Sequence, residues 1–408
     1  MSSCLNIIQI IILTILILML LNKQKEKLTF YIEPFPGTEA LLNKKAEITK
    51  TESNEIKQQK LKWCKSSKEN INDRLKSLFN SMDIRFTNNP KKCNFYIPYW
   101  YSDDELTEFV NKNYRPNMIL NVIPGVDYLN RKHKLWMALV KWTGRKKASQ
   151  IMPPSYALYD NEWKYFEKDF EKDFEKGQYY LLKTEEENAQ GIFVYNDMNK
   201  IKEKVMDKKL KYPVTVIQRF IEPLLIKGRT FKLRLFLFVK CKGGKKELYI
   251  HKQGGVFYAK EKFNPRKLTY ENVVANAYWF NGTPINEVKE FLKNHPRNLV
   301  QLKKYFQNTN VDGEKLFSKI NKLLKVVATG LKDKICTISK LKKNVKVGLF
   351  GIDIIVDKNF KPWLIEMNVS PSSTAFDQLG EKQKQQVWVD TMKITLLKNP
   401  KDHQFDLL

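Results

Sequence analysis

Hydrophobic positions divide the chain into three stretches of different character. The first, Leu5 to Leu21, reads LNIIQIIILTILILMLL and carries no charge. The second, from about Thr38 to Lys60, is rich in Lys, Glu and Asn and could contribute little to a core. From Trp63 onward apolar residues recur with the spacing of a folded protein. We therefore expect a stalk or linker at residues 28–60 and folded structure from about residue 61.

The apolar N-terminal stretch is near the lower limit of length for a transmembrane helix. A signal peptide is the main alternative, but no small-residue cleavage site follows, and the sequence continues as NKQKEK at residues 22–27. Basic residues tend to stay on the cytoplasmic side. Residues 1–27 therefore predict an uncleaved single-pass membrane anchor, with its N-terminus outside and the rest of the chain cytoplasmic.

The remainder mixes helical and strand patterns. Ile71, Leu75 and Leu78 follow helical spacing, and a polar, mostly helical stretch fills Asn272–Lys343. Short runs of aromatic and β-branched residues predict strands at Asn94–Tyr99, Tyr179–Lys183, Val214–Ile221, Phe231–Val239, Leu248–His251 and Val256–Ala259. These elements indicate an α/β (α+β) protein with mixed or antiparallel sheets.

Charge and cysteine content limit the class of partner and the compartment. The 408 residues include 72 Lys+Arg and 44 Asp+Glu, a net charge of +28 that favours an acidic partner. With no zinc-finger spacing and no RNP-like motif, nucleic acid is not favoured. The five cysteines are widely spaced without a C-x-x-C pair. This spacing argues against a disulfide framework and against a structural zinc site. It favours a reducing compartment.

The richest segment is Val345–Ser373, which reads VKVGLFGIDIIVDKNFKPWLIEMNVSPSS. Its two apolar runs, Leu349–Val356 and Trp363–Met367, flank the polar sequence DKNFK and predict a β-hairpin. We expect Asp357 to pair with Pro362 across a four-residue loop.

That register places Asp353 directly opposite Glu366, and Asn368 shares their face because side chains alternate along a strand. Ile352, Ile354, Ile365 and Met367 then point into the core. Two opposed carboxylates are destabilising unless a cation lies between them. Two carboxylates and an amide oxygen suit Mg²⁺ that takes its other ligands from water and phosphate. A solvent-exposed pair is the alternative.

The sequence LFGIDIIVDKNFKPWLIEMNVSPS resembles the C-terminal signature of the tubulin–tyrosine ligase-like family, whose members have an ATP-grasp core. The resemblance implies ATP and Mg²⁺ as cofactors and assigns the metal ligands to Asp353, Glu366 and Asn368. It divides the chain into an N-terminal α/β domain (61–150), a central ATP-grasp subdomain (151–225) and a C-terminal subdomain with the hairpin (226–400).

Further residues acquire roles from the same resemblance. The segment VIQRFIEPLLIKGRTFKLRLFLFV resembles the family's hinge and basic strand, so Gln218 and the backbone of Arg219, Phe220 and Ile221 would meet adenine. Lys183 and Lys132 would contact phosphates. Asp353 would also contact the nucleotide, and the catalytic residues would be Arg234 and Glu366.

Three features depart from the family pattern. The loop after Lys183 is acidic, with Glu185, Glu186 and Glu187. The family usually has Lys-Phe-Asp-[Leu/Ile]-Arg where this chain reads TFKLR, so Thr230 and Lys232 replace a basic and an acidic residue. The next strand usually carries an arginine after its glycine turn, where Gly254-Gly255 here leads to Phe257.

These observations predict a ligase. ATP would phosphorylate a protein carboxylate, and an amino acid would attack the acylphosphate. The resemblance implies an acidic acceptor, such as the C-terminal tail of tubulin, and an added tyrosine, glutamate or glycine. One alternative is a catalytically inactive, membrane-tethered adaptor that binds acidic tails, which the replacements favour. Another is an ATP-grasp peptide ligase with a non-tubulin acceptor.

Overall fold

The computed structural model describes residues 60–408, apart from short gaps at 67–70, 72, 99–102, 114, 116–117, 127–128, 130, 174–175, 187–189, 276–278, 281–282, 285, 310, 337–340, 342–343, 370, 372–377, 398–399 and 401. The anchor predicted at residues 1–27 and nearly all of the predicted stalk lie outside the described residues. Within the described part of the chain, no helix combines the length and the apolar character needed to cross a bilayer.

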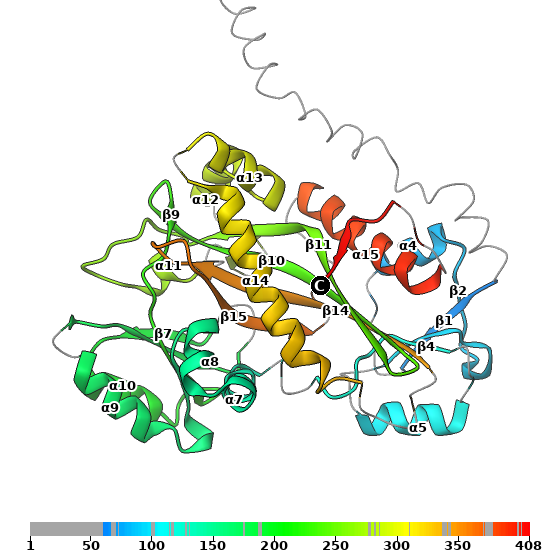
Figure 1. The fold of residues 1–408 in the computed structure, drawn as a ribbon, viewed down its shortest axis with the longest axis horizontal. Helices are drawn as coiled ribbons and strands as arrows, with labels where there is room; N and C mark the ends of the chain where they lie inside the picture. The colour runs from blue at the N-terminus through cyan, green and yellow to red at the C-terminus, as the bar shows by residue number, and fades with distance from the viewer. Residues whose placement is uncertain are drawn as a thin grey trace, which may run out of the picture. The chain divides into compact units, whose positions relative to one another are not determined.

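A ten-stranded mixed sheet is the largest element (Figure 1). Its strands run in the order β16-β11-β10-β14-β4-β3-β1-β2, with β15 paired to β14 and β9 paired to β10. The bounds are β1 Lys62–Lys65, β2 Arg85–Phe86, β3 Phe95–Ile97, β4 Ile119–Leu120, β9 Leu225–Ile226, β10 Arg229–Lys242, β11 Lys245–Tyr258, β14 Val345–Val356, β15 Pro362–Val369 and β16 Phe405–Leu407. The predicted mixture of parallel and antiparallel pairing is confirmed.

The hairpin of β10 and β11 is longer than the sequence pattern predicts. The runs Leu248–His251 and Val256–Ala259, expected as two strands, belong to the single strand β11, and Gly254-Gly255 continues that strand instead of forming a turn. A Cβ on Gly254 would lie 2.6 Å from the carbonyl oxygen of Arg234 on the neighbouring strand. Glycine is therefore required here by close backbone approach, not by chain reversal.

Strand β14 holds the large sheet together. It pairs antiparallel with β10 along most of its length. On its other edge, its first residues pair parallel with β4, and its second half pairs antiparallel with β15. The strands near the N-terminus therefore share one sheet with the C-terminal hairpin. The expected N-terminal α/β domain does not have a separate sheet.

A second, four-stranded antiparallel sheet lies within residues 155–219. Its order is β5-β8-β6-β7, with β5 Ser155–Ala157, β6 Tyr180–Thr184, β7 Ile192–Tyr195 and β8 Val214–Arg219. Helices α9 (Trp163–Asp173) and α10 (Met198–Val205) cover it through an aromatic core that includes Phe166 and Tyr180. In Figure 1 this green unit stands beside the large sheet.

Helices pack against both faces of the large sheet. Their bounds are α4 Asp73–Ser81, α5 Asp103–Asn113, α7 Lys132–Thr143, α8 Arg145–Ile151, α11 Tyr270–Val273, α12 Asn286–Lys293, α13 Leu299–Gln307, α14 Gly313–Lys332 and α15 Gln378–Leu396. Short 3₁₀ turns at Pro90–Lys92 and Leu158–Asp160 and a small hairpin of β12 (Trp279–Phe280) and β13 (Thr283–Pro284) complete the described elements.

Helix α14 shows why the sequence folds this way. Asp312 caps it by accepting a hydrogen bond from the backbone N–H of Lys315 at 2.9 Å. Its apolar residues recur every three to four positions and are buried. They join Leu233, Leu235 and Ile352 of the sheet in the main core. Figure 1 shows α14 lying across the large sheet. Lys232 and Arg234 of β10 and Asp353 of β14 alternate with these sheet residues and therefore face the other side of the sheet.

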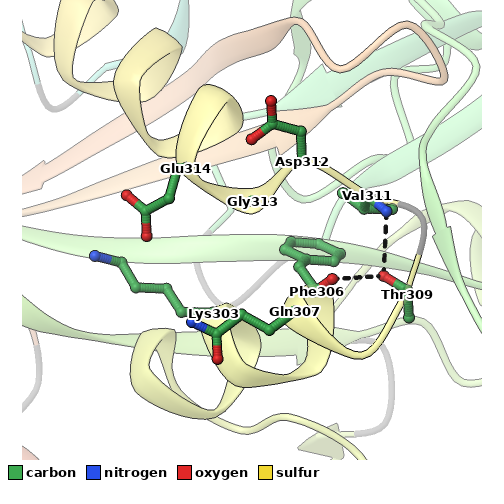
Figure 2. A pocket seen from close by; sticks show the side chains of 8 residues that line it. All are labelled: Lys303, Phe306, Gln307, Thr309, Val311, Asp312, Gly313 and Glu314. Carbon is green, nitrogen blue, oxygen red and sulfur yellow. Dashed lines mark hydrogen bonds between the residues drawn. The ribbon is translucent and has the colours of Figure 1, made fainter.

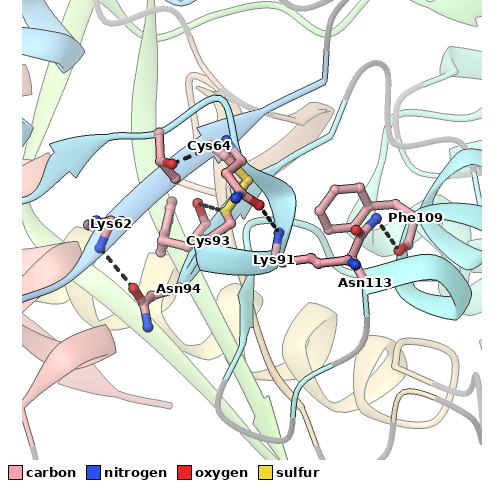
Figure 3. Close-up of a disulfide and its surroundings, with 10 residues drawn as sticks. Lys62, Cys64, Lys91, Cys93, Asn94, Phe109 and Asn113 are labelled. Carbon is pink, nitrogen blue, oxygen red and sulfur yellow. Dashed lines mark hydrogen bonds between the residues drawn. A yellow bond between two sulfur atoms is a disulfide. The ribbon is translucent and has the colours of Figure 1, made fainter.

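Two disulfides contradict the prediction from cysteine spacing. Cys64 of β1 is bonded to Cys93, which precedes β3 (Figure 3), and Cys241 of β10 is bonded to Cys336 after α14. The expectation of no disulfide framework was wrong because both pairs come from sequence-distant segments that the sheet brings together. Such pairs leave no local spacing pattern. Disulfides are typical of oxidising compartments, which also weakens the reducing-compartment interpretation.

Breaking either disulfide should reduce stability. Each closes a long loop, so its loss should lower the free energy of unfolding by roughly 2–4 kcal/mol. Urea unfolding of Cys64→Ser and Cys241→Ser variants, with and without reductant, measures this. Reductant should lower the midpoint of the original chain and change each variant less. If maleimide labels all five cysteines of the denatured, unreduced chain, the disulfides are absent.

Candidate active site

The two predicted carboxylates lie opposite each other on the hairpin of β14 and β15. Asp353 pairs with Glu366, and Gly351 pairs with Asn368 two residues along, so the predicted opposition is confirmed. The loop differs from the prediction, because Val356 and not Asp357 pairs with Pro362. A loop of five residues alone would have placed a different residue opposite Asp353.

A bulge at Ile365 restores the predicted alignment. Ile354 pairs with Leu364, whereas the preceding Asp353 pairs with Glu366, so Ile365 is the extra residue. Leu364 has no solvent exposure and takes the core position expected for Ile365, which is only partly buried. The bulge therefore lets an apolar run fill the core and still presents Glu366 to Asp353.

The loop is shaped by Asp357, which is buried at its start. One carboxylate oxygen accepts the backbone N–H groups of Asn359 at 2.8 Å and Lys361 at 2.9 Å, and the other accepts the indole N–H of Trp363 at 3.0 Å. Phe360 has a positive φ of 59°. These bonds organise the five-residue turn, which the sequence pattern alone did not reveal.

Asp353 has no solvent exposure and is held by two cations from β10. The guanidinium of Arg234 binds both of its oxygens, with Nη2 3.0 Å from Oδ2 and a shorter contact from Nε to Oδ1. The Nζ of Lys232 lies 2.7 Å from Oδ2. Burial acts to raise the pKa of Asp353, but Arg234 and Lys232 outweigh it and hold that pKa well below its usual range.

A glycine makes room for the arginine. A Cβ on Gly351 would lie 3.0 Å from Cδ and 3.2 Å from Nη1 of Arg234. The guanidinium can therefore lie across β14 and reach Asp353. An alanine at this position would force Arg234 to shift, so this glycine supports the ion pair.

Glu366 and Asn368 form the more open side of the site. Both are partly buried, and the side-chain amide of Asn368 donates to Oε1 of Glu366 at 3.2 Å. This contact leaves the amide oxygen of Asn368 for another partner. Ser370 and Ser372, which follow in the sequence, lie outside the described residues.

The donor chemistry of this corner fits Mg²⁺. Two carboxylates and one amide oxygen are hard oxygen ligands. Within the described ranges, no group of three or more His, Cys, Asp or Glu residues is arranged to hold a metal. A cation would therefore depend on substrate oxygens for its remaining ligands. Both oxygens of Asp353 are already engaged, so Glu366 and Asn368 would carry most of the coordination.

Lys183, at the end region of β6, is buried beside this corner. Its Nζ donates to Oε1 of Gln218 at 2.6 Å, and the amide nitrogen of Gln218 donates to the hydroxyl of Ser155 at 2.9 Å. Burial lowers the pKa of Lys183 to about 8, although the nearby Glu366 acts to raise it. The four-stranded sheet thus presents a fixed ammonium to the carboxylates of the large sheet.

Lys132 and the acidic loop after β6 bind one another. The Nζ of Lys132 donates to the carbonyls of Thr184 and Glu186, each at 3.0 Å. The carboxylate of Glu185 is 2.8 Å from Nδ1 of His133 and accepts the hydroxyl of Thr215 at 2.9 Å. Glu185 is therefore hydrogen-bonded within the protein. The phosphate role expected for Lys132 stays a prediction. Glu187 lies outside the described residues.

The predicted hinge connects the two sheets. Arg219 donates its backbone N–H to Pro154, Phe220 donates to Tyr179, and the guanidinium of Arg219 pairs with Asp173 at 3.0 Å. These N–H groups are thus engaged within the protein. Adenine contacts by Gln218, Arg219, Phe220 and Ile221 stay predictions, with Gln218 also occupied by Lys183.

A surface pocket lies elsewhere, between α13 and α14 (Figure 2). It measures about 220 Å³ and is lined by Lys303, Phe306, Gln307, Thr309, Val311, Asp312, Gly313 and Glu314. None of the predicted site residues lines it. The clustered charges around Asp353 therefore identify the candidate active site better than this depression does.

Sequence reasoning missed two contributors to the site. Lys232 was noted as a departure from the family pattern, but its partner Asp353 was not recognised. The signal was available, because Lys232 and Arg234 alternate with buried apolar residues on one strand and so share a face. Ser155, which supports Gln218, had no such signal because its partner is 63 residues away.

The sequence matches a known protein family. The sequence model of the tubulin-tyrosine ligase family matches residues 110–404, well over half of the chain. The chain belongs to this family, which is part of the ATP-grasp superfamily. The matched range includes both sheets' contributions to the site, from Lys132 to Asn368.

Several named proteins resemble the chain. The probable tubulin polyglutamylase TTLL2 of Mus musculus is 29% identical over 320 residues, 73% of this chain and 54% of that protein. The tubulin polyglutamylase ttll-4 of Caenorhabditis elegans is 28% identical over a segment that covers 68% of this chain and 45% of that protein. The tubulin glycylase 3D of Tetrahymena thermophila is 25% identical over 51% and 20%. The chain thus spans about half the length of the first two relatives.

Removing the charge of Asp353 should cost stability, whereas removing that of Glu366 should not. Asp353→Asn leaves two poorly exposed cations without their counter-charge and should lower the free energy of unfolding by about 3 kcal/mol. Glu366→Gln keeps its shape and contacts and should change it by less than about 1 kcal/mol. Urea unfolding without nucleotide compares the two. Equal effects would contradict the ion-pair assignment.

Proposed function

We propose that this chain is an ATP- and Mg²⁺-dependent ligase that joins glutamate to carboxylates of an acidic protein. The observation that carries the proposal is the opposition of Asp353 and Glu366, with Asn368 on the same face and Lys183 buried nearby. This combination of acidic groups for a metal ion and basic groups for phosphates suits a nucleoside triphosphate. It lies within the range that matches the tubulin-tyrosine ligase family.

The residues would act by positioning and by neutralising charge. The ammonium of Lys183, held by Gln218, would bind ATP phosphates, and Arg234 would face the transferred phosphoryl group or the acceptor carboxylate. Glu366, Asn368 and Asp353 would hold Mg²⁺, which when bound offsets charge on the β- and γ-phosphates. The phosphate role of Lys132 requires its ammonium to leave the loop carbonyls or to act through them.

The reaction has two balanced steps. An oxygen of the acceptor carboxylate attacks the γ-phosphorus of ATP, which releases ADP and forms an acylphosphate. The amine of the incoming amino acid then attacks the acyl carbon, which releases inorganic phosphate and one proton and forms the amide. No covalent enzyme intermediate is needed, so positioned cations are sufficient machinery.

Glutamate and tubulin enter the proposal through the relatives. Two of those reported above are named polyglutamylases of tubulin, and one is named a glycylase. The net charge of +28 suits an acidic acceptor such as a tubulin tail. Because the chain spans about half of the first two relatives, a non-tubulin acidic acceptor is the second candidate for the substrate.

The inactive adaptor is the second candidate function. Its support is the ion pair of Lys232 with Asp353, which occupies an oxygen that a metal would use. Such a protein would bind acidic tails through its basic surface without turning over ATP. Retention of Asp353, Glu366 and Asn368 together supports the enzyme instead.

The cellular placement of the chain also remains a proposal. An anchor at residues 1–27 with a cytoplasmic domain follows from sequence alone and lies outside the described residues. The disulfides Cys64–Cys93 and Cys241–Cys336 favour an oxidising compartment instead. Membrane fractionation combined with protease protection of the folded part distinguishes the two orientations.

Ligase activity is the direct test of the proposed function. The purified chain should release ADP only when ATP, Mg²⁺, glutamate and an acidic tubulin-tail peptide are all present. Glu366→Gln should lower the rate by at least about a hundredfold, because a weaker ligand for Mg²⁺ leaves the charge of the phosphates less neutralised. Glu314→Gln, an exposed change on α14, should leave it unaltered. Mass spectrometry of the peptide identifies the amino acid added.

The outcomes of that assay separate the candidates. Addition of glycine or tyrosine would correct the substrate and keep the reaction. ATP binding without turnover for every acceptor and amino acid would favour the adaptor. Turnover unaffected by Glu366→Gln would exclude the hairpin as the site.

ATP affinity should depend on pH through Lys183. Its ammonium, whose pKa is about 8 before binding, is charged at pH 7 and increasingly neutral above pH 8. Because phosphate stabilises the charged form, binding must then take up a proton, and affinity should fall by up to roughly tenfold per pH unit above 8. Calorimetric titration from pH 7 to 9 measures this. Lys183→Arg, which stays charged, should show a flat profile; equal profiles would contradict the role.

A further inference from the structure

Lys232 brings a positive charge to the carboxylate that would hold the metal. It lies on β10 one pleat away from Arg234, opposite Ile355 of β14 and Phe257 of β11. From there its side chain reaches diagonally to Asp353, with Nζ 2.7 Å from Oδ2. The side chain of Lys232 is only 12% exposed, so the contact is largely shielded from water.

The surroundings favour this position of the ammonium. Its Nζ lies 5.8 Å from the centre of the Phe257 ring, within the range of a cation–π contact. Phe257 and Lys232 pair directly across the two strands, so the contact follows from the sheet register. The ammonium of Lys232 is therefore in contact with both the aromatic ring and Asp353.

Asp353 consequently has little capacity left for a divalent cation. Arg234 and Lys232 supply two positive charges to a carboxylate with a single negative charge. A doubly charged ion placed at Oδ2 would be repelled by the ammonium at short range. Metal binding at full strength would require Lys232 to move away.

We propose that Lys232 supplies at Asp353 part of the positive charge that Mg²⁺ would otherwise supply, so that this chain binds ATP with a weakened dependence on the metal. The proposal rests on the proposed nucleotide site and deepens it. Lys232 acts as a phosphate-side cation fixed in the protein, together with Lys183 and Arg234. Glu366 and Asn368 remain to hold a metal at the more open side.

Nucleotide binding in the presence and absence of metal tests this. Calorimetry with the full-length chain would use ATP in excess Mg²⁺ and in EDTA. We expect the original chain to lose less than about tenfold in affinity in EDTA. Lys232→Met, which keeps most of the length of the side chain without its charge, should lose at least about a hundredfold in EDTA while binding close to normally with Mg²⁺.

A control variant and a measurement of metal affinity test whether the effect comes from the charge of Lys232. Lys242→Met changes an exposed lysine near the other end of the same strand and should behave as the original chain does. The affinity of the ATP-bound chain for Mn²⁺, measured by electron paramagnetic resonance, should increase in Lys232→Met because the competing charge is gone. Thermal unfolding shows whether that variant is folded.

The outcomes distinguish this inference from the proposed function. If EDTA lowers the ATP affinity of the original chain as strongly as that of Lys232→Met, the inference is overturned and the proposed function stays intact. Unchanged Mn²⁺ affinity in a folded Lys232→Met variant would overturn it as well. Failure of ATP to bind under every condition would overturn the proposed function and this inference with it.

Discussion

The charge of Asp353 lies in the second half of β14 with no access to solvent, and the neighbouring strands are arranged around it. A carboxylate in that position is tolerated only if cations accompany it. Register supplies them, because β10 places Arg234 directly opposite and Lys232 one pleat away. Gly351 leaves space for the guanidinium, so the sheet's geometry and the site's electrostatics are one constraint.

The site is assembled from two sheets that meet beside this carboxylate. The large sheet contributes Asp353, Glu366 and Asn368, and the four-stranded sheet contributes Lys183 through the hydrogen-bonded chain from Ser155. The segment after β8 continues into contacts with the hairpin loop, where Lys358 and Glu222 interact through both backbone and side chain. Movement between the sheets would therefore change the distance between the ammonium and the carboxylates.

Family membership and local chemistry answer different questions about this protein. The match to the tubulin-tyrosine ligase family covers the hairpin that carries the acidic pair. It does not explain Lys232, whose contact with Asp353 belongs to this chain's own sequence. The disulfide between Cys241 and Cys336 likewise ties β10, the strand that bears both cations, to the segment following α14. Both features concern the same strand, which links stability to the site.

The sequence by itself determined the hairpin and the mixed α/β class, because alternation and turn residues act over a few positions. It predicted the opposition of Asp353 and Glu366 from a four-residue loop, whereas the structure reaches it through a five-residue loop and a bulge. It did not determine the bulge at Ile365, the single strand through Gly254 or the disulfides. Tertiary structure decided these, together with the ion pair of Lys232 and the support of Lys183 by Gln218. The disulfides, the ion pair and the support of Lys183 join residues far apart in the chain, and only the packing of the strands sets which of them meet. The bulge lies within one hairpin, where it lets Leu364 fill the core.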